Sequence, residues 1–137
     1  MGIYSGLSNL GHDIAVDASS NVYITGYFQN TADFDPGSGT ENLTSNGAAD
    51  IFFAKYSSIG DLIWVKSVGS IQDLNVQVDA QVSLNSMAVD ASGNVHITGS
   101  FKGILDVDPG EGTTNLVCKG LAELYFAKYS SSGNLIW

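Results

Sequence analysis

The stretch AVDASSNVYITG, residues 15–26, decides the fold of this chain because it returns almost unchanged as AVDASGNVHITG at residues 88–99. The same shift of 73 residues aligns residues 15–64 with residues 88–137, and about 31 of the 50 aligned positions are identical, with no insertion or deletion. A fixed period of this kind indicates a repeat architecture, in which each unit buries its apolar faces against its neighbours. The repeat therefore predicts an architecture, and it says little about a ligand or a reaction.

Each copy contains four strong strand signals separated by short polar turns. In the first copy these signals lie at residues 14–17, 21–28, 50–56 and 61–66. They are rich in β-branched and aromatic residues, which favour strands. An excursion between the second and third signals holds two weaker extended pieces, at residues 32–35 and 41–45. No segment shows a sustained helical period.

Apolar residues on both sides of the expected strands indicate sheets that are covered on both faces. Phe52 and Phe53 are adjacent and must point to opposite faces, because successive side chains alternate along a strand. A small antiparallel sheet that is repeated in tandem and covered on both faces is typical of a β-propeller blade. We therefore predict an all-β fold of two tandem four-stranded antiparallel propeller blades. Residues 1–73 would form the first blade with a joining segment, and residues 74–137 the second.

Composition and charge exclude several classes of function. Five basic residues stand against fourteen acidic ones, for a formal net charge of −9, which would repel phosphate backbones and anionic membranes. No apolar run approaches the roughly 20 residues that span a bilayer. We therefore expect neither nucleic-acid binding nor membrane insertion. The single cysteine, Cys118, cannot form an intrachain disulfide, and we expect it to be a small packing residue.

Four segments of the first copy together carry a resemblance to a known repeat. Residues 14–26, 33–37, 50–56 and 60–64 resemble the β-propeller repeat common in secreted and cell-surface proteins of bacteria, of the seven-bladed-propeller and Bacteroidetes type. The resemblance implies a four-stranded blade and an exported protein with an extracellular or cell-surface location, often within a large multidomain parent. It carries over no catalytic residue, because the family shares an architecture rather than a reaction.

The best candidates for a site are two matched acidic turns. Asp33 and Asp35 precede Pro36-Gly37, and Asp106 and Asp108 precede the same dipeptide in the second copy. Carboxylates spaced by two on an extended segment project to the same side, where they could hold calcium together with turn carbonyls. The same residues are equally the signature of a tight turn, in which the carboxylate accepts backbone N–H groups. Both interpretations remain open from the sequence.

Other repeated polar residues are better explained by structure than by chemistry. Asp17 and Asp90 each begin a short polar turn, and we expect their carboxylates to cap a hairpin. Lys55 and Lys128 lie inside aromatic strands, so that each stem should pack while the head reaches water or a turn carboxylate.

Some residues that could bind a ligand differ between the two copies. His12 and His96 have no histidine counterpart in the other copy, so neither belongs to a repeated ligand set. Most aromatic residues should fill the space between blades. Tyr27 is replaced by Ser100 in the second copy, and we expect it to be the most exposed of the aromatic residues of the first copy.

Two blades do not close a ring, because propellers have about four to eight blades. We therefore expect further blades, supplied either by copies of the chain in a head-to-tail ring or by a longer parent chain. The favoured function is a non-catalytic scaffold or binding module of an exported bacterial protein, with a protein or a glycan as ligand, since no repeated nucleophile, base or metal cluster is evident. The alternative is a glycoside hydrolase-like enzyme that uses the four turn carboxylates around a ring channel.

Overall fold

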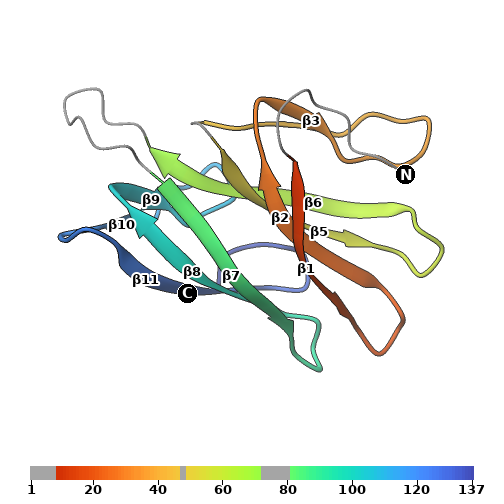
Figure 1. Ribbon diagram of the computed structural model, residues 1–137. Helices are drawn as coiled ribbons and strands as arrows, with labels where there is room; N and C mark the ends of the chain where they lie inside the picture. The colour runs from red at the N-terminus through yellow and green to blue at the C-terminus, as the bar shows by residue number, and fades with distance from the viewer. Residues whose placement is uncertain (1–8, 47–48, 72–80) are drawn as a thin grey trace.

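The computed structural model describes residues 9–46, 49–71 and 81–137, and these residues form strands, turns and loops without a helix. Among them, accordingly, no helix is long and apolar enough to cross a bilayer. The predicted all-β, antiparallel fold is confirmed (Figure 1). The expected boundary between the two units, at residues 73 and 74, lies outside the described residues.

The first blade is a four-stranded antiparallel meander. Its strands, in spatial order, are β1 (Leu10–Val16), β2 (Val22–Phe28), β5 (Asp50–Tyr56) and β6 (Leu62–Ile71). Each neighbouring pair is antiparallel, and the register places Tyr23 opposite both Ala15 and Lys55. The four strong strand signals of the first copy therefore form one sheet, as predicted.

The second blade repeats three of these strands. They are β7 (Gln81–Val89), β8 (Val95–Lys102) and β11 (Glu123–Tyr129). At the place of β6, the described residues form only an isolated bridge between Tyr129 and Leu135. The backbone of Lys128 adds bonds to Ile136 and Trp137, so this last segment still lies along the edge of β11.

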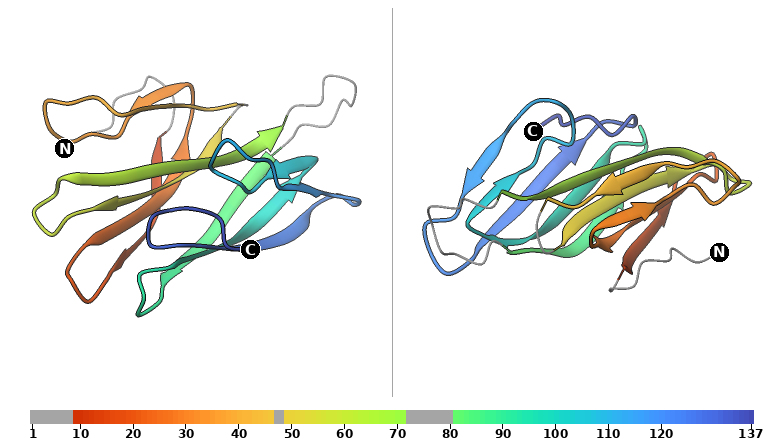
Figure 2. Two further views of the ribbon diagram at one scale, coloured as in Figure 1. Left: turned by 180° about the vertical axis from the view of Figure 1, so that it is seen from behind. Right: turned by 90° about the horizontal axis from the view of Figure 1, so that it is seen from above.

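The excursion in each copy forms a short hairpin. The first contains β3 (Thr31–Asp33) and β4 (Asn42–Thr44), and the second contains β9 (Ile104–Asp106) and β10 (Asn115–Val117). In the second copy, β9 pairs antiparallel with the end of β6, with Gly69 opposite Asp106 and Ile71 opposite Ile104. The hairpin of the second repeat thus extends the sheet of the first blade, an arrangement visible from both sides in Figures 1 and 2. The sequence alone did not predict this link between blades.

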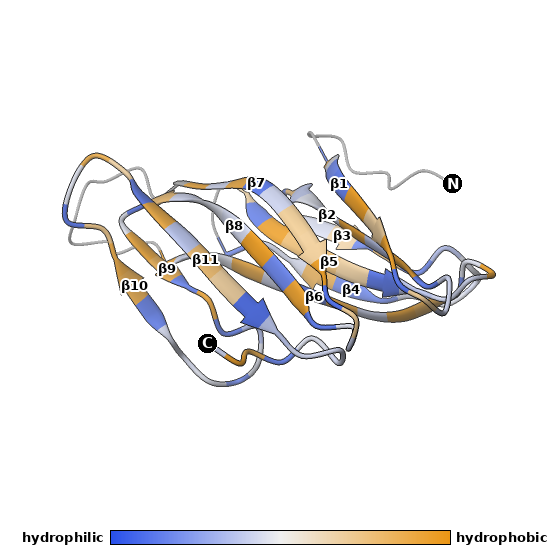
Figure 3. Ribbon diagram, turned by 90° about the horizontal axis from the view of Figure 1, so that it is seen from below, coloured by the Kyte–Doolittle hydropathy of each residue, from blue (hydrophilic) through white to orange (hydrophobic). Residues whose placement is uncertain are grey.

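The two sheets stack face to face, and the main core lies between them (Figure 2). The first blade contributes Tyr23, Ile51 and Phe53, and the second contributes Ile97 and Tyr125 among others. A second cluster lies on the opposite face of the first blade, where the β3–β4 hairpin packs against it through Phe34. Along β8 the hydropathy of successive residues changes (Figure 3) and their burial alternates, so that one side of the strand faces the main core and the other faces away.

Candidate functional site

The two acidic turns use their carboxylates to hold their own backbone. Asp33 Oδ1 accepts the N–H groups of Asp35 at 3.0 Å and of Glu41 at 2.9 Å. The second copy repeats this arrangement, with Asp106 Oδ1 accepting the N–H of Asp108 at 3.0 Å. These are the hydrogen bonds of a turn in which a side chain replaces part of the backbone pairing. The geometry favours the tight-turn interpretation of the sequence.

The glycines that follow each turn explain why the motif continues as Pro-Gly-x-Gly. Asp35 Oδ1 accepts the N–H of Gly37 at 2.7 Å, and a Cβ at Gly39 would meet Asp35 Oδ2 at 2.1 Å. Gly112 stands in the same relation to Asp108, with a separation of 2.3 Å. No three His, Cys, Asp or Glu side chains within residues 9–46, 49–71 and 81–137 gather into a metal-binding group. Calcium at these turns stays a prediction.

The shorter hairpin turns are held by a second pair of aspartates. Asp17 accepts both the backbone N–H and the side-chain amide of Asn21 at 2.9 Å, and the side-chain bond is the main reason why the pKa of Asp17 falls to about 2. Lys55 Nζ lies 3.5 Å from Asp17 Oδ2, and Lys128 Nζ lies 3.3 Å from Asp90 Oδ2. The predicted roles of these aspartates as turn caps, and of the lysines as their partners, are confirmed.

The acidic turns do not form a paired acid and base. Each carboxylate bonds within its own hairpin, and no hydrogen bond among the described residues joins the Asp33 turn to the Asp106 turn. A glycosidase needs two carboxylates that flank one scissile bond. The described part of the chain therefore gives the enzymatic alternative no support.

A buried carboxylate at the boundary between the blades was missed by the sequence analysis. Asp50 is 1% exposed, its Oδ2 accepts the N–H of Asn46 at 2.9 Å, and its Oδ1 has no hydrogen-bond partner among the described residues. Burial raises the pKa of Asp50. The carboxylate lies over Gly69, where a Cβ would meet Oδ1 at 2.1 Å, and it borders a polar cavity of ≈ 180 Å³ shared with Asp106 and Asp108. The available signal was an acidic residue at the start of an apolar strand in both copies.

The second blade exposes a face whose counterpart in the first blade is buried. We call this surface the open face; it consists of the outward side chains of Ala88, His96, Thr98, Leu124, Phe126 and Trp137. Ile51 and Phe53 of the first blade are 0% and 1% exposed, because the second blade covers them. Their repeat counterparts, Leu124 and Phe126, are 67% and 66% exposed. The open face is therefore an interblade surface without a neighbouring blade among the described residues.

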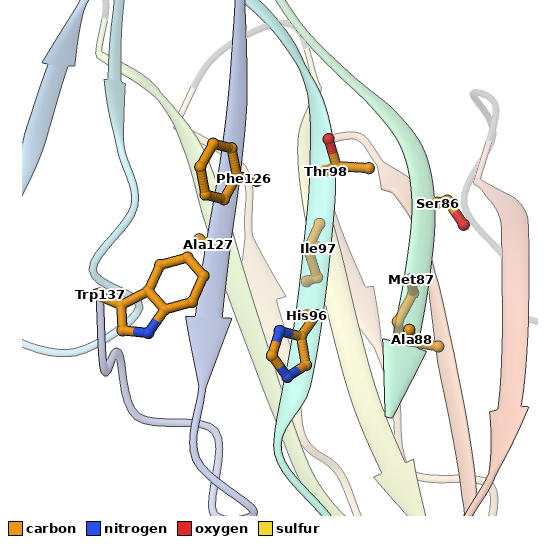
Figure 4. Close-up of a pocket in the computed structure, with 9 residues that line it drawn as sticks. All are labelled: Ser86, Met87, Ala88, His96, Ile97, Thr98, Phe126, Ala127 and Trp137. Atoms are coloured by element: carbon orange, nitrogen blue, oxygen red, sulfur yellow. The ribbon is translucent and has the colours of Figure 1, made fainter. Parts of the chain in front are cut away.

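Three rings gather on the open face beside a cavity of ≈ 220 Å³ (Figure 4). Trp137 meets Phe126 edge to face at 5.7 Å between ring centroids, and it meets His96 at 6.3 Å. His96 Nε2 lies 3.4 Å from Asp90 Oδ2, so the histidine is tied to the turn cap of its own blade. From the sequence, His96 was excluded from a repeated ligand set because the first copy has no histidine at the matching position. That matching position holds Tyr23, a residue of the core.

Tyr27 is partly buried and does not face solvent, although most other aromatic residues of its copy are covered more completely. Its ring packs against the interblade core, and its hydroxyl donates to the carbonyl of Leu84 in the second blade at 3.1 Å. Tyr27 lacks a tyrosine counterpart because it fastens one blade to the other, and not because it faces solvent. Cys118 is partly buried against the same core and its Sγ donates to the Gly120 carbonyl, which confirms its expected role in packing.

Comparison with known proteins identifies a distant relative. The chain is 25% identical over 154 residues to an uncharacterized WD repeat-containing protein of Acanthamoeba polyphaga mimivirus, and the alignment covers 94% of this chain. It covers only 10% of that protein, so this chain spans about a tenth of its relative's length. No family model and no solved structure matches. The similarity supports a propeller-type repeat, in agreement with the two stacked blades.

Proposed function

We propose that the chain is a non-catalytic propeller-type scaffold that binds protein through its open face. The observation that carries this proposal is the exposure of Leu124 and Phe126 at repeat positions where Ile51 and Phe53 are buried. A contiguous apolar surface of this kind marks an interaction site on a soluble protein. Aromatic side chains such as Phe126 and Trp137 supply much of the binding energy in protein interfaces.

The distant relative and the state of the carboxylates both support a scaffold. The relative's name describes WD repeats, and WD repeats are four-stranded propeller blades. The acidic side chains that sequence analysis offered as catalytic groups are engaged in turns. Binding through a surface requires no convergent nucleophile and base.

Paired affinity captures test the proposal. Wild-type chain, Phe126→Ser and Ile59→Ser would be immobilised at equal density and exposed to the same extract, and each captured protein would then be purified and titrated. Ile59 is the control because it is 84% exposed in a turn outside the open face. We expect partners that bind wild type and Ile59→Ser alike, and bind Phe126→Ser at least tenfold more weakly. Partners that bind Phe126→Ser as tightly as wild type would contradict a role for the open face.

A glycan is the second candidate ligand, and the ring cluster favours it. Trp137, Phe126 and His96 border one open cavity, and aromatic rings of this kind can stack on sugar faces. A glycan array read with wild type and Trp137→Ala tests this ligand class. Binding that disappears in Trp137→Ala would support it, and silence across a broad array would count against it.

An exported parent protein, located outside the cell or at its surface, is a proposal that rests on the repeat resemblance. Antibody labelling of intact cells, compared with permeabilised cells of the source organism, tests it directly. Labelling confined to permeabilised cells would contradict an extracellular location.

A further inference from the structure

Inside the chain, the first blade inserts a pair of aromatic rings into the second. The ring of Phe53 lies 4.6 Å from the ring of Tyr129, measured between centroids. Trp64 Nε1 donates to the carbonyl of Ser131 at 3.1 Å. Phe53 and Trp64 meet edge to face at 5.8 Å and 79°. We call this pair the knob, and the apolar surface around Tyr129 the hollow that receives it.

The second blade carries the same knob, and no hollow receives it within the part of the chain that the structure describes. Phe126 and Trp137 stand 73 residues after Phe53 and Trp64, and they are 66% and 55% exposed. They meet edge to face at 5.7 Å and 79°, nearly the geometry of the Phe53–Trp64 pair. The free knob is thus already arranged as the docked pair of the first blade is, which lowers the entropy lost on docking.

The first blade carries the same hollow, and no knob from residues 9–46, 49–71 or 81–137 fills it. Tyr56 and Ser58 are the counterparts of Tyr129 and Ser131, and with Val22 and Ile24 they border an open apolar hollow of ≈ 280 Å³. A cavity of about 150 Å³ is enough to hold benzene, so a phenyl ring fits this volume. In the second blade, Val95 and Ile97, the counterparts of Val22 and Ile24, are fully covered, being 0% and 2% exposed.

At the rim of the empty hollow, too, a residue of the first blade is exposed where its counterpart in the second blade is covered. Ile14 is 65% exposed in β1, whereas its counterpart Met87 in β7 is 8% exposed under the first blade. Ile14 lies directly opposite Ile24 in the sheet, and therefore on the same face. The unpaired apolar surface thus extends from the hollow across β1.

We propose that a second copy of this chain docks head to tail, with Phe126 and Trp137 of one copy entering the hollow around Tyr56 of the next. The occupant is a second copy because the interface already exists within the chain, and each free surface repeats one half of it. The contact is heterologous, joining two different surfaces, so it can continue from copy to copy. This inference rests on the proposed function, since it names the protein that the open face binds.

Two single-face variants test the direction of docking. Phe126→Asp disables the knob and Ile14→Asp disables the hollow, because each would bury an unpaired charge at the contact. Both positions are about two-thirds exposed in the isolated chain, so circular dichroism and the melting temperature should stay close to wild type. Ile59→Ser is the control, because Ser132 occupies the matching position and is exposed as well.

Sedimentation velocity and light scattering give the readout over a hundredfold range of concentration. Wild type and Ile59→Ser should associate with rising concentration, while each Asp variant alone should associate at least tenfold more weakly. An equimolar mixture of the two Asp variants should form a heterodimer and stop there, because one intact knob and one intact hollow remain.

Three results would overturn the inference. A folded wild-type monomer over the whole range would show that the two faces do not dock. Unimpaired association of either Asp variant would place the contact elsewhere, and failure of the mixture to pair would indicate contact between like surfaces. A wild-type monomer that still binds another protein through Phe126 would overturn this inference and leave the proposed function standing.

Discussion

The stacking of the blades predicts very different costs for one substitution at two matched positions. Phe53 and Phe126 are the same residue, at the same place of the repeat and in matching strands, but Phe53 is buried between the blades and Phe126 is exposed. Truncation of a buried phenylalanine to alanine costs about 3–5 kcal/mol, because transfer energy is lost and a cavity remains. A surface substitution costs less than about 0.5 kcal/mol. Phe53→Ala should therefore destabilise the chain by about 2.5 kcal/mol or more beyond Phe126→Ala.

Urea unfolding measures both costs under identical conditions. Circular dichroism would follow the transition, with the free energy of unfolding extrapolated linearly to water. The protein concentration would be kept below that at which wild type associates, so that the open face stays free. Small domains are stable by only about 5–15 kcal/mol, so the loss of unfolding free energy in Phe53→Ala should lower the urea concentration at the midpoint measurably.

Equal losses in the two variants would refute the reasoning. Such a result would mean that Phe126 is as buried as Phe53, or that the blades do not stack through this face. A small loss in both would mean that the interblade core does not hold the chain together. Only a large difference is compatible with one covered and one uncovered copy of the same surface.

Three further predictions concern the carboxylates. Asp50→Asn should raise the free energy of unfolding at pH 7 by about 1–2 kcal/mol, because it removes a buried charge that lacks a full set of hydrogen bonds. Burial raises the pKa of Asp50, so wild type should lose stability as the pH rises above the pKa of the unfolded carboxyl group, about 4, and Asp50→Asn should lose less. Asp17 has its pKa lowered to about 2, so its stabilising effect should be complete above about pH 4 and vanish as pH falls toward 2, a slope in melting temperature that Asp17→Asn should flatten. Chelation should leave the melting temperature unchanged, because the Asp106 carboxylate holds its turn through backbone N–H groups; a fall that calcium reverses would instead support a metal there.

Much of the fold could be predicted because the repeat and the local strand signals agree. Residues 15–26 combine two strand segments with a turn that Asp17 and Asn21 close, and every interaction involved is local. The acidic turn around Asp33 is local too, so its residues indicated a turn before any contact was known. Local chemistry of this kind is readable from a single sequence.

The features that escaped prediction depend on contacts between distant residues. The pairing of β9 with the end of β6 places Ile104 opposite Ile71, and no local sequence pattern predicts this pairing. The burial of Asp50 depends on the closeness of Gly69, which the sequence places on another strand. The exposure of Phe126 is the clearest case, because an identical residue at the matching place is buried. Its environment is set by the presence or absence of a neighbouring blade.

The interblade contact inside the chain includes two polar contacts that the second blade cannot repeat. Asp13 Oδ2 accepts the N–H of Met87 at 2.8 Å, and the Tyr27 hydroxyl bonds to the backbone of Leu84. Their counterparts on the second blade are Ser86 and Ser100, which lack the reach and the charge for these contacts.

The free knob therefore keeps the apolar contacts and the indole N–H of Trp137, but the second blade lacks the counterparts of the Asp13 and Tyr27 contacts. Burial of apolar surface supplies affinity with little direction, while hydrogen-bonded pairs fix one register. Docking of a second copy should thus be weaker and more easily reversed than the stacking of the two blades within the chain. If the Ser100→Tyr substitution restores the missing contact, it should tighten association of the copies. In the isolated chain it should cost only the hydrogen bond between the Ser83 and Ser100 hydroxyls, about 1 kcal/mol, and sedimentation and urea unfolding can measure the two effects separately.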